Sequence, residues 1–137
     1  MSEPCRVEHL NPADLVRTPA FTQVVTVSGT AKTIYVGGQN AVTSSGEIVG
    51  RGHIAAQTEQ VFRNLELALG AAGARLEHVI KWTIHVVDGQ PLQPAFEVFQ
   101  RVWGRRPNPP LITLAIVSAL ANPDFLVELE AIAVIRE

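Results

Sequence analysis

The sequence contains very little cysteine and no long apolar run. Its single cysteine, Cys5, lies in a polar N-terminal segment and cannot form an internal disulfide. The first ten residues have no apolar signal core. Ser118, Asn122 and Asp124 interrupt the longest apolar stretch, well short of the roughly 20 residues that cross a bilayer. We therefore expect a soluble, cytoplasmic protein.

A large excess of charge of either sign is also missing. The chain has 11 Lys and Arg against 13 Asp and Glu, a formal net charge of −2. Such a chain has no long-range attraction to nucleic-acid phosphates or to anionic lipid, so we expect neither nucleic acid nor membrane as a partner. A length of 137 residues with 47% hydrophobic content predicts one domain, residues 1–137, with residues 1–20 as an N-terminal arm.

The N-terminal half contains two turn signals. Two β-rich runs between Thr22 and Gly38 flank the residues 28–31, where Gly29 can adopt a positive φ. This pattern predicts a β-hairpin. A second turn at 44–46 has short apolar arms, which predict a minor extension of the sheet.

Two segments have the apolar spacing of amphipathic helices. The first runs from Ile54 to Ala72, with Gly70 and Gly73 near its end. The second follows Pro91, and Gly104 can close it. Each helix has a single apolar stripe, so each should pack by one face.

Three further segments are predicted to be strands. Residues 79–87 alternate, with Trp82 on the apolar side and His85 on the polar side. The prolines at 107, 109 and 110 end any helix, and the uncharged run 111–117 that follows lacks alternation, which predicts a strand buried on both faces. The last strand, 125–135, has apolar residues on both faces.

The predicted order is strand, strand, helix, strand, helix, strand, strand. It indicates an α+β domain with a mixed sheet and two helices on one face. The uncovered face retains apolar positions on at least two strands, a patch that a monomer rarely exposes. We therefore expect a closed homo-oligomer.

Four segments resemble the RidA/YjgF (reactive intermediate deaminase) family, and the resemblance extends from Phe21 to the C-terminus. They are VGGQNAV, TEQVFRNLELALGAAGARLEHVIKWTIHV, AFEVFQRVWG and VELEAIAV. The resemblance implies a chorismate-mutase-like fold and a trimer that encloses a central barrel, with ligand clefts between subunits. It also implies hydrolysis of reactive enamines and imines, such as 2-aminoacrylate, to keto acids and ammonia without a metal or organic cofactor.

The resemblance also implies site residues. Glu128 matches the glutamate that positions or activates water in the family. Phe21 stands where an aromatic residue, commonly tyrosine, is found, and Thr113 replaces a frequent cysteine. The implied ligand-binding positions are Phe21, Gly37, Gly38, Gln93, Leu111 and Thr113.

Leu111 departs from the family pattern. It falls where active relatives have an arginine that binds the substrate carboxylate, and leucine offers neither charge nor hydrogen-bond donor. Two hypotheses follow: a deaminase with altered specificity, or a non-catalytic member that senses a metabolite or binds other proteins. A shift of the loop would let Arg105 or Arg106 replace the arginine, although a solvated pair of arginines is the favoured interpretation.

The remaining polar candidates are assigned structural roles. Glu130 shares a strand face with Glu128, about 6.5 Å away, and is expected to face solvent or pair with a cation. His53 and His85 have no partner at a metal-ligand spacing and are predicted to be neither ligands nor bases. Trp82 and Trp103 are expected in the core.

Overall fold

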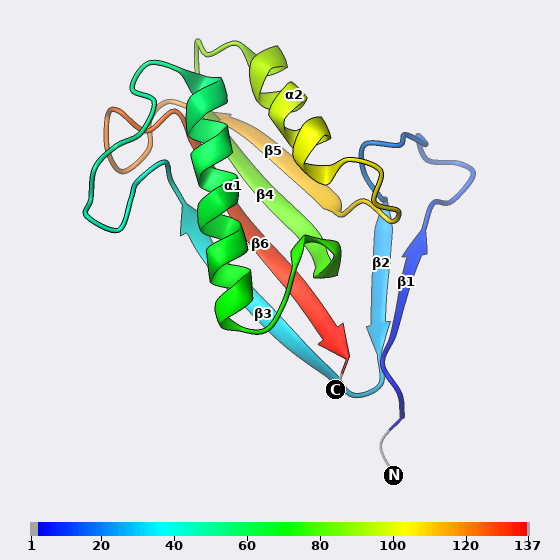
Figure 1. Cartoon of the computed structure of the whole chain (residues 1–137). Helices are drawn as coiled ribbons and strands as arrows, with labels where there is room; N and C mark the ends of the chain where they lie inside the picture. Colours follow the sequence, from blue (N-terminus) through cyan, green and yellow to red (C-terminus); the bar gives the residue numbers. More distant parts are fainter. Residues whose placement is uncertain (1–2, 137) are drawn as a thin grey trace.

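A four-stranded sheet forms the centre of the structure, a computed structural model that describes residues 3–136 (Figure 1). Its strand order is β3 (Ala31–Gln39), β6 (Val127–Arg136), β4 (Val79–Val87) and β5 (Leu111–Val117). β4 and β5 are parallel and the other pairs are antiparallel, so the sheet is mixed. The predicted α+β class is confirmed.

Two helices, α1 (Ile54–Ala71) and α2 (Leu92–Trp103), cover one face of this sheet (Figure 1). Leu65 and Leu69 of α1 have no exposed surface, and Ala95 and Val98 of α2 are also buried. Both helices therefore pack by one stripe, as their apolar spacing predicts. A short 3₁₀ helix, η1 (Leu76–His78), leads into β4. Neither α1 nor α2 is long and apolar enough to cross a membrane.

An aromatic cluster fills the core between the helices and β4. Trp82 is 3% exposed, and its ring centroid lies 5.8 Å from that of Phe62 and 6.3 Å from that of Phe99. All these pairs meet edge to face, the geometry that aromatic quadrupoles favour. Trp103 packs at the margin of the same cluster.

The predicted hairpin between Thr22 and Gly38 is wrong in its pairing. β2 (Val24–Ser28) pairs antiparallel with β1 (Arg6–Leu10), a strand absent from the predicted order, while β3 pairs with β6. The turn itself is present, with Gly29 at φ 82°. A Cβ on Gly29 would lie 2.0 Å from the Pro4 carbonyl oxygen, so the N-terminal segment occupies the space beside the turn. β1 thus supplies the backbone partners that the prediction assigned to β3.

Two other predictions about strands also need correction. The segment 40–50 contains a single bridge between Val42 and Ile48, and does not extend the four-stranded sheet. β5 is an edge strand, and Thr113 and Ile116 on it are exposed, so it is not buried on both faces within one chain. Ile112 and Leu114 pack against the core on the helix side, whereas Leu111, Ala115 and Val117 on the other side are half-buried.

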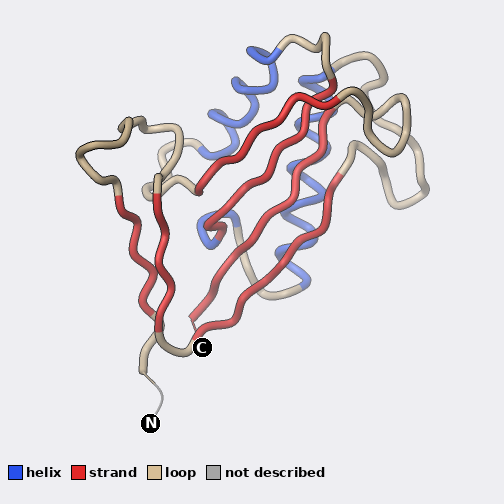
Figure 2. The backbone as a smooth tube through the Cα atoms, turned by 180° about the vertical axis from the view of Figure 1, so that it is seen from behind, coloured by secondary structure: helices blue, strands red, loops and turns tan. Residues whose placement is uncertain are grey.

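Neither α1 nor α2 covers the sheet face on the other side (Figure 2). We call it the open face. Tyr35 on β3 lies there with 77% of its surface exposed, next to Ile132 of β6 in the strand register. The open face is thus partly apolar, and its cover by further copies of the chain stays a prediction.

Candidate functional site

Two polar side chains meet on the open face. His85 of β4 and Glu128 of β6 are register partners across the antiparallel pair, and His85 Nδ1 lies 3.3 Å from Glu128 Oε2. Their side chains are 33% and 29% exposed, respectively. The pair is therefore held by the sheet and still reached by water.

Gly38 of β3 makes room for the Glu128 carboxyl group. A Cβ at position 38 would lie 2.6 Å from Glu128 Oε1 and 2.8 Å from its Cδ. The β3–β6 register shifts between Val36 and Gln39, so the strand is irregular at this point. Glu128 is thus in contact with His85 on one side and with bare backbone on the other.

Buried neighbours fix the position of Glu128 in the strand. Val127 and Leu129 point toward the helices with no exposed surface, so Glu128 between them must point to the open face. The start of β6 is fixed by Gln57 of α1, which is fully buried. Gln57 Nε2 donates to the Asp124 carbonyl oxygen at 2.9 Å, and the Leu126 amide donates to Gln57 Oε1 at 2.9 Å.

Leu111 and Thr113 also lie on the open face, but one strand beyond His85. Thr113 is the register neighbour of Thr83, and Leu111 that of Lys81. β5 and β6 are separated by β4, so their backbones lie about 10 Å apart. Glu130, two residues after Glu128, is exposed.

Phe21 and Gln93 lie on the opposite side of the sheet from Glu128. Both line an apolar pocket of about 580 Å³ between α2, β5 and the loop before β2. The walls of this pocket also include the core side chains Trp82, Ile112 and Leu114. One chain therefore does not bring Phe21 and Gln93 together with Glu128.

Arg106 is engaged at the end of α2. Its guanidinium donates to the carbonyl oxygens of Val102 and Trp103 at 2.9 Å and stacks over the Trp103 ring, 5.9 Å from the centroid. Its Nε also lies 3.7 Å from Glu77 Oε2. These contacts hold Arg106 away from the open face.

The chemistry available at the His85–Glu128 pair is proton transfer. A carboxylate beside an imidazole, both reached by water, can take a proton from water and return it to a reacting nitrogen. Within residues 3–136 no group of three or more His, Cys, Asp or Glu side chains could hold a metal ion.

His85 is the functional candidate that the sequence did not identify. The sequence shows no partner for it at a metal-ligand spacing. The alternation of β4 does place it on the polar face, but its partner is 43 residues away and becomes visible only with the β4–β6 register.

Comparison with known proteins accounts for the fold. The sequence model of the endoribonuclease L-PSP family, which includes the RidA/YjgF proteins, matches residues 14–135. The chain belongs to the RidA/YjgF family. The resemblance seen in the sequence is therefore confirmed over almost the whole domain of this RidA/YjgF protein.

Individual relatives of this RidA/YjgF protein span the same region. A RutC family protein of Pyrococcus abyssi is 37% identical over 101 residues, which cover 73% of this chain and 76% of that protein. The 2-iminobutanoate/2-iminopropanoate deaminase of Rattus norvegicus is 34% identical over 116 residues, covering 84% and 80%. A crystal structure of a Rid-family protein of unknown function from Yersinia pestis is 30% identical, with a TM-score of 0.81 over 93% of this chain and 97% of that one.

Proposed function

We propose that this RidA/YjgF-family protein hydrolyses small reactive imines and enamines to the carbonyl compound and ammonia. The observation that carries the proposal is the Glu128 carboxyl group, placed between His85 and Gly38 on a water-accessible sheet face. The name of the rat relative, an iminobutanoate and iminopropanoate deaminase, supports this reaction class. A net charge of −2 gives no attraction to RNA, so the reaction in the family's endoribonuclease description is not the one proposed.

The proposed reaction consumes one water molecule. Glu128 accepts a proton from the water as its oxygen bonds to the imine carbon, and the electrons of the C=N π bond move to nitrogen, which is protonated. The resulting amino alcohol collapses: its hydroxyl proton passes through Glu128 to the amino group, the C–N bond breaks, ammonia leaves and the carbonyl forms. An enamine enters the same route after protonation at carbon. His85 holds one oxygen of Glu128, and the other oxygen, against Gly38, meets the water.

Neighbouring copies complete the cleft in this proposal. Phe21 and Gln93 of the same chain lie behind the sheet, so the open face needs a wall from elsewhere. We propose a homotrimer whose open faces enclose a central barrel and whose clefts lie at the subunit boundaries. The exposed Tyr35 and the apolar positions beside it support such cover.

A second candidate function is a metabolite sensor without catalysis, and Leu111 favours it. A direct assay separates the two: 2-aminoacrylate is generated in situ, and its disappearance is followed with and without the protein. Acceleration proportional to protein concentration supports the hydrolase. No acceleration at high protein concentration rejects the hydrolase and leaves the sensor.

Gly38→Ala should lower kcat/KM for this hydrolysis by at least tenfold while the protein remains folded. Gly38 does not have a positive φ, so alanine fits the backbone, but its Cβ displaces the flexible Glu128 carboxyl group. Misplacement of a catalytic group by about 1 Å costs roughly a hundredfold. Steady-state kinetics and circular dichroism measure the two effects.

Gly37→Ala is the matched comparison for this variant. A Cβ at Gly37 has no heavy atom within 4 Å, so Glu128 should keep its position. Any decrease of kcat/KM in this variant therefore measures the space that the ligand itself needs beside β3. Equal losses in both alanine variants would contradict the specific role of Gly38.

Leu111→Arg should raise kcat/KM for carboxylate-bearing imines by about tenfold, the value of one charged hydrogen bond in a partly solvated cleft. The side chain lies on the open face beside Lys81, so the new cation adds to an existing one. An imine without a carboxylate is the control substrate and should gain nothing. An equal increase of kcat/KM for both substrates would show that the side chain at position 111 does not bind the carboxylate.

A further inference from the structure

His85 has a ring nitrogen that the proposed hydrolysis does not use. Its Nδ1 faces Glu128 Oε2 at 3.3 Å. Its Nε2, on the other side of the ring, has no hydrogen-bond partner among residues 3–136 and is not enclosed, since 33% of the side chain is exposed. Imidazole is the side chain that enzymes use most often to transfer protons. Nε2 is therefore free to exchange a proton with a bound molecule.

The contact with Glu128 determines which proton of His85 can be transferred. When His85 is protonated, both ring nitrogens carry a hydrogen. The Nδ1 hydrogen is held by the Glu128 carboxylate in a hydrogen bond that is then charge-assisted. The Nε2 hydrogen has no such acceptor within the described residues. It is the proton that a protonated His85 can donate.

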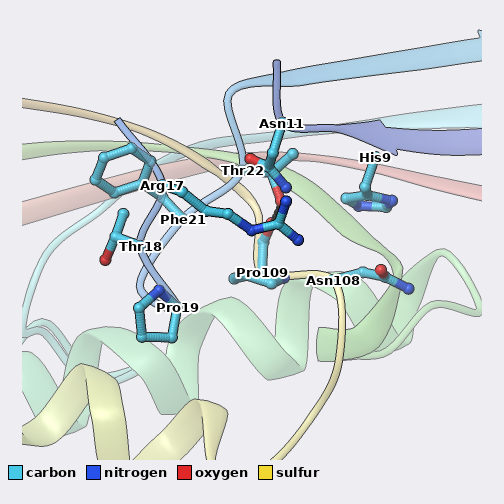
Figure 3. Close-up of a pocket in the computed structure, with 9 residues that line it drawn as sticks. All are labelled: His9, Asn11, Arg17, Thr18, Pro19, Phe21, Thr22, Asn108 and Pro109. Carbon is cyan, nitrogen blue, oxygen red and sulfur yellow. Dashed lines mark hydrogen bonds between the residues drawn. The ribbon is translucent and has the colours of Figure 1, made fainter. Parts of the chain in front are cut away.

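The other three histidines of the chain lack this arrangement. His9 lines the polar pocket of Figure 3 together with Arg17, but its Nε2 is inaccessible to water. His78 Nδ1 accepts a hydrogen bond from the Arg75 amide at 2.9 Å. His53 is exposed at the start of α1. Within residues 3–136, none of these three side chains forms an ion pair with a carboxylate.

The two sides of His85 differ in polarity. Toward β6 it faces Glu128, and toward β5 its register partner is Ala115, whose side chain is a single methyl group. Val87, two residues along β4 on the same face, is also apolar, and both it and Ala115 are half-buried. Water is therefore favoured on the side of Glu128 and Gly38, whereas an apolar carbon is favoured on the side of Ala115.

An enamine needs one step that an imine does not need. Before water adds, a proton must bond to a carbon of the C=C bond. The π electrons of that bond form the new C–H bond, and the nitrogen lone pair forms the C=N bond of an iminium ion. In the proposed hydrolysis the free oxygen of Glu128 holds the attacking water, which separates Glu128 from the substrate. The proton for carbon has to come from a neighbouring group.

We propose that His85 is the acid that protonates the enamine carbon, so that this chain converts enamines to imines in the site where it hydrolyses them. The Nε2 proton bonds to carbon, the N–H electron pair stays on Nε2, and the imidazolium becomes a neutral imidazole. Water then adds to the iminium carbon with Glu128 as the base. The inference rests on the proposed function, because the iminium ion formed at His85 is hydrolysed at Glu128.

Solvent restores both groups after the reaction. When the carbonyl has formed and ammonia has left, Glu128 retains the proton that the water lost, and His85 lacks the proton that carbon gained. Both side chains are reached by water, so Glu128 releases its proton to solvent and Nε2 takes one up. One enamine and one water molecule thus give the carbonyl compound and ammonia with no net change in the protein.

The enamine 2-aminobut-2-enoate, generated in situ from threonine by β-elimination of water, tests the inference in D₂O. There His85 carries a solvent deuteron, and its delivery from one face gives a single configuration at the deuterated carbon of the 2-oxobutanoate product. Uncatalysed protonation gives both configurations equally. The product is reduced enzymatically as it forms, which prevents further exchange, and NMR resolves the configuration. We expect one configuration in excess, and the excess should rise with protein concentration.

His85→Gln should abolish this excess, because glutamine can donate to Glu128 from its amide but cannot give up a proton to carbon. The comparison substrate is 2-iminoacetate, which has no enamine form. The variant should lower kcat/KM for the enamine by about tenfold or more beyond its effect on 2-iminoacetate, since a positioned acid contributes roughly 10²–10⁴-fold. His53→Gln is the matched control, and it should keep both the excess and the ratio of the two kcat/KM values.

Three results would overturn the inference. They are equal amounts of the two configurations although the wild-type protein accelerates hydrolysis, an undiminished excess in His85→Gln, and an equal loss of kcat/KM for both substrates in that variant. In each case the wild-type protein still accelerates hydrolysis of 2-iminoacetate. Failure of the proposed function is a different result, in which neither substrate is hydrolysed faster with the protein than without it, and it rejects both proposals.

Discussion

Glu128→Gln should lower kcat/KM for 2-aminoacrylate hydrolysis by about 10²–10⁴-fold, the contribution of a positioned proton-transfer group. Glutamine has nearly the same shape and can still accept a hydrogen bond from His85, so the sheet should be unchanged. It cannot take a proton from water. Initial rates across a range of substrate concentrations would show whether the loss falls on kcat.

Glu130→Gln is the control for that variant. Glu130 lies two residues further along the same strand face, is exposed, and pairs in register with Thr83 rather than with His85. Its replacement should change kcat/KM less than threefold. If Glu130→Gln is inactive and Glu128→Gln is active, the acid–base role belongs to the other carboxylate; if both variants keep full activity, the proposed mechanism is wrong.

Gln57→Leu should lower the free energy of unfolding by about 2–4 kcal/mol, because backbone groups that its buried side chain holds lose their partners at about 1–3 kcal/mol each. Gln57 is fully buried in α1, where its amide accepts from the Leu126 N–H and donates to the Asp124 carbonyl oxygen. Leucine has a similar volume and replaces neither contact. Urea unfolding followed by tryptophan fluorescence would give the difference.

Gln60→Leu is the control that separates the loss of these hydrogen bonds from the general effect of replacing a glutamine in α1 by leucine. Gln60 lies one turn further along α1, and its amide contacts only Asn64 and Arg63, side chains of the same helix. Its replacement should cost less than about 1 kcal/mol. A loss as large as that of Gln57→Leu would mean that helix surface polarity, rather than the attachment of β6, determines stability at this position.

Apolar periodicity correctly predicted the helices and strands in which the pattern of buried side chains follows from the element's own sequence. α1 and α2 each present one apolar stripe, and β4 alternates, so the structure reproduces the predicted bounds closely. The predicted pairing of β2 with β3 was wrong, because strand propensity does not say which neighbouring strand will pair with it. Arg6–Leu10 has no apolar alternation strong enough to indicate a strand, and it is ordered by β2.

The site was predictable only in part. Glu128 came from the family resemblance, and its position next to Gly38 depends on the irregular β3–β6 register, which no sequence pattern specifies. His85 required the β4–β6 register. The separation of Phe21 from Glu128 was also invisible, because residues 11–23 have no periodicity and their path depends on the contact of Thr22 with the proline loop.

The position of β5 at the rim of the sheet has a consequence for handling the protein. One edge of this strand bonds to β4, and among the described strands no other one satisfies the outward amides and carbonyls of seven uncharged residues, Leu111–Val117. Such an unpaired strand edge can form a sheet with strands of other chains. The Thr22 amide donates to the carbonyl oxygen of Pro110, the residue just before this strand, so shortening the N-terminus should expose more of the unpaired edge and favour aggregation.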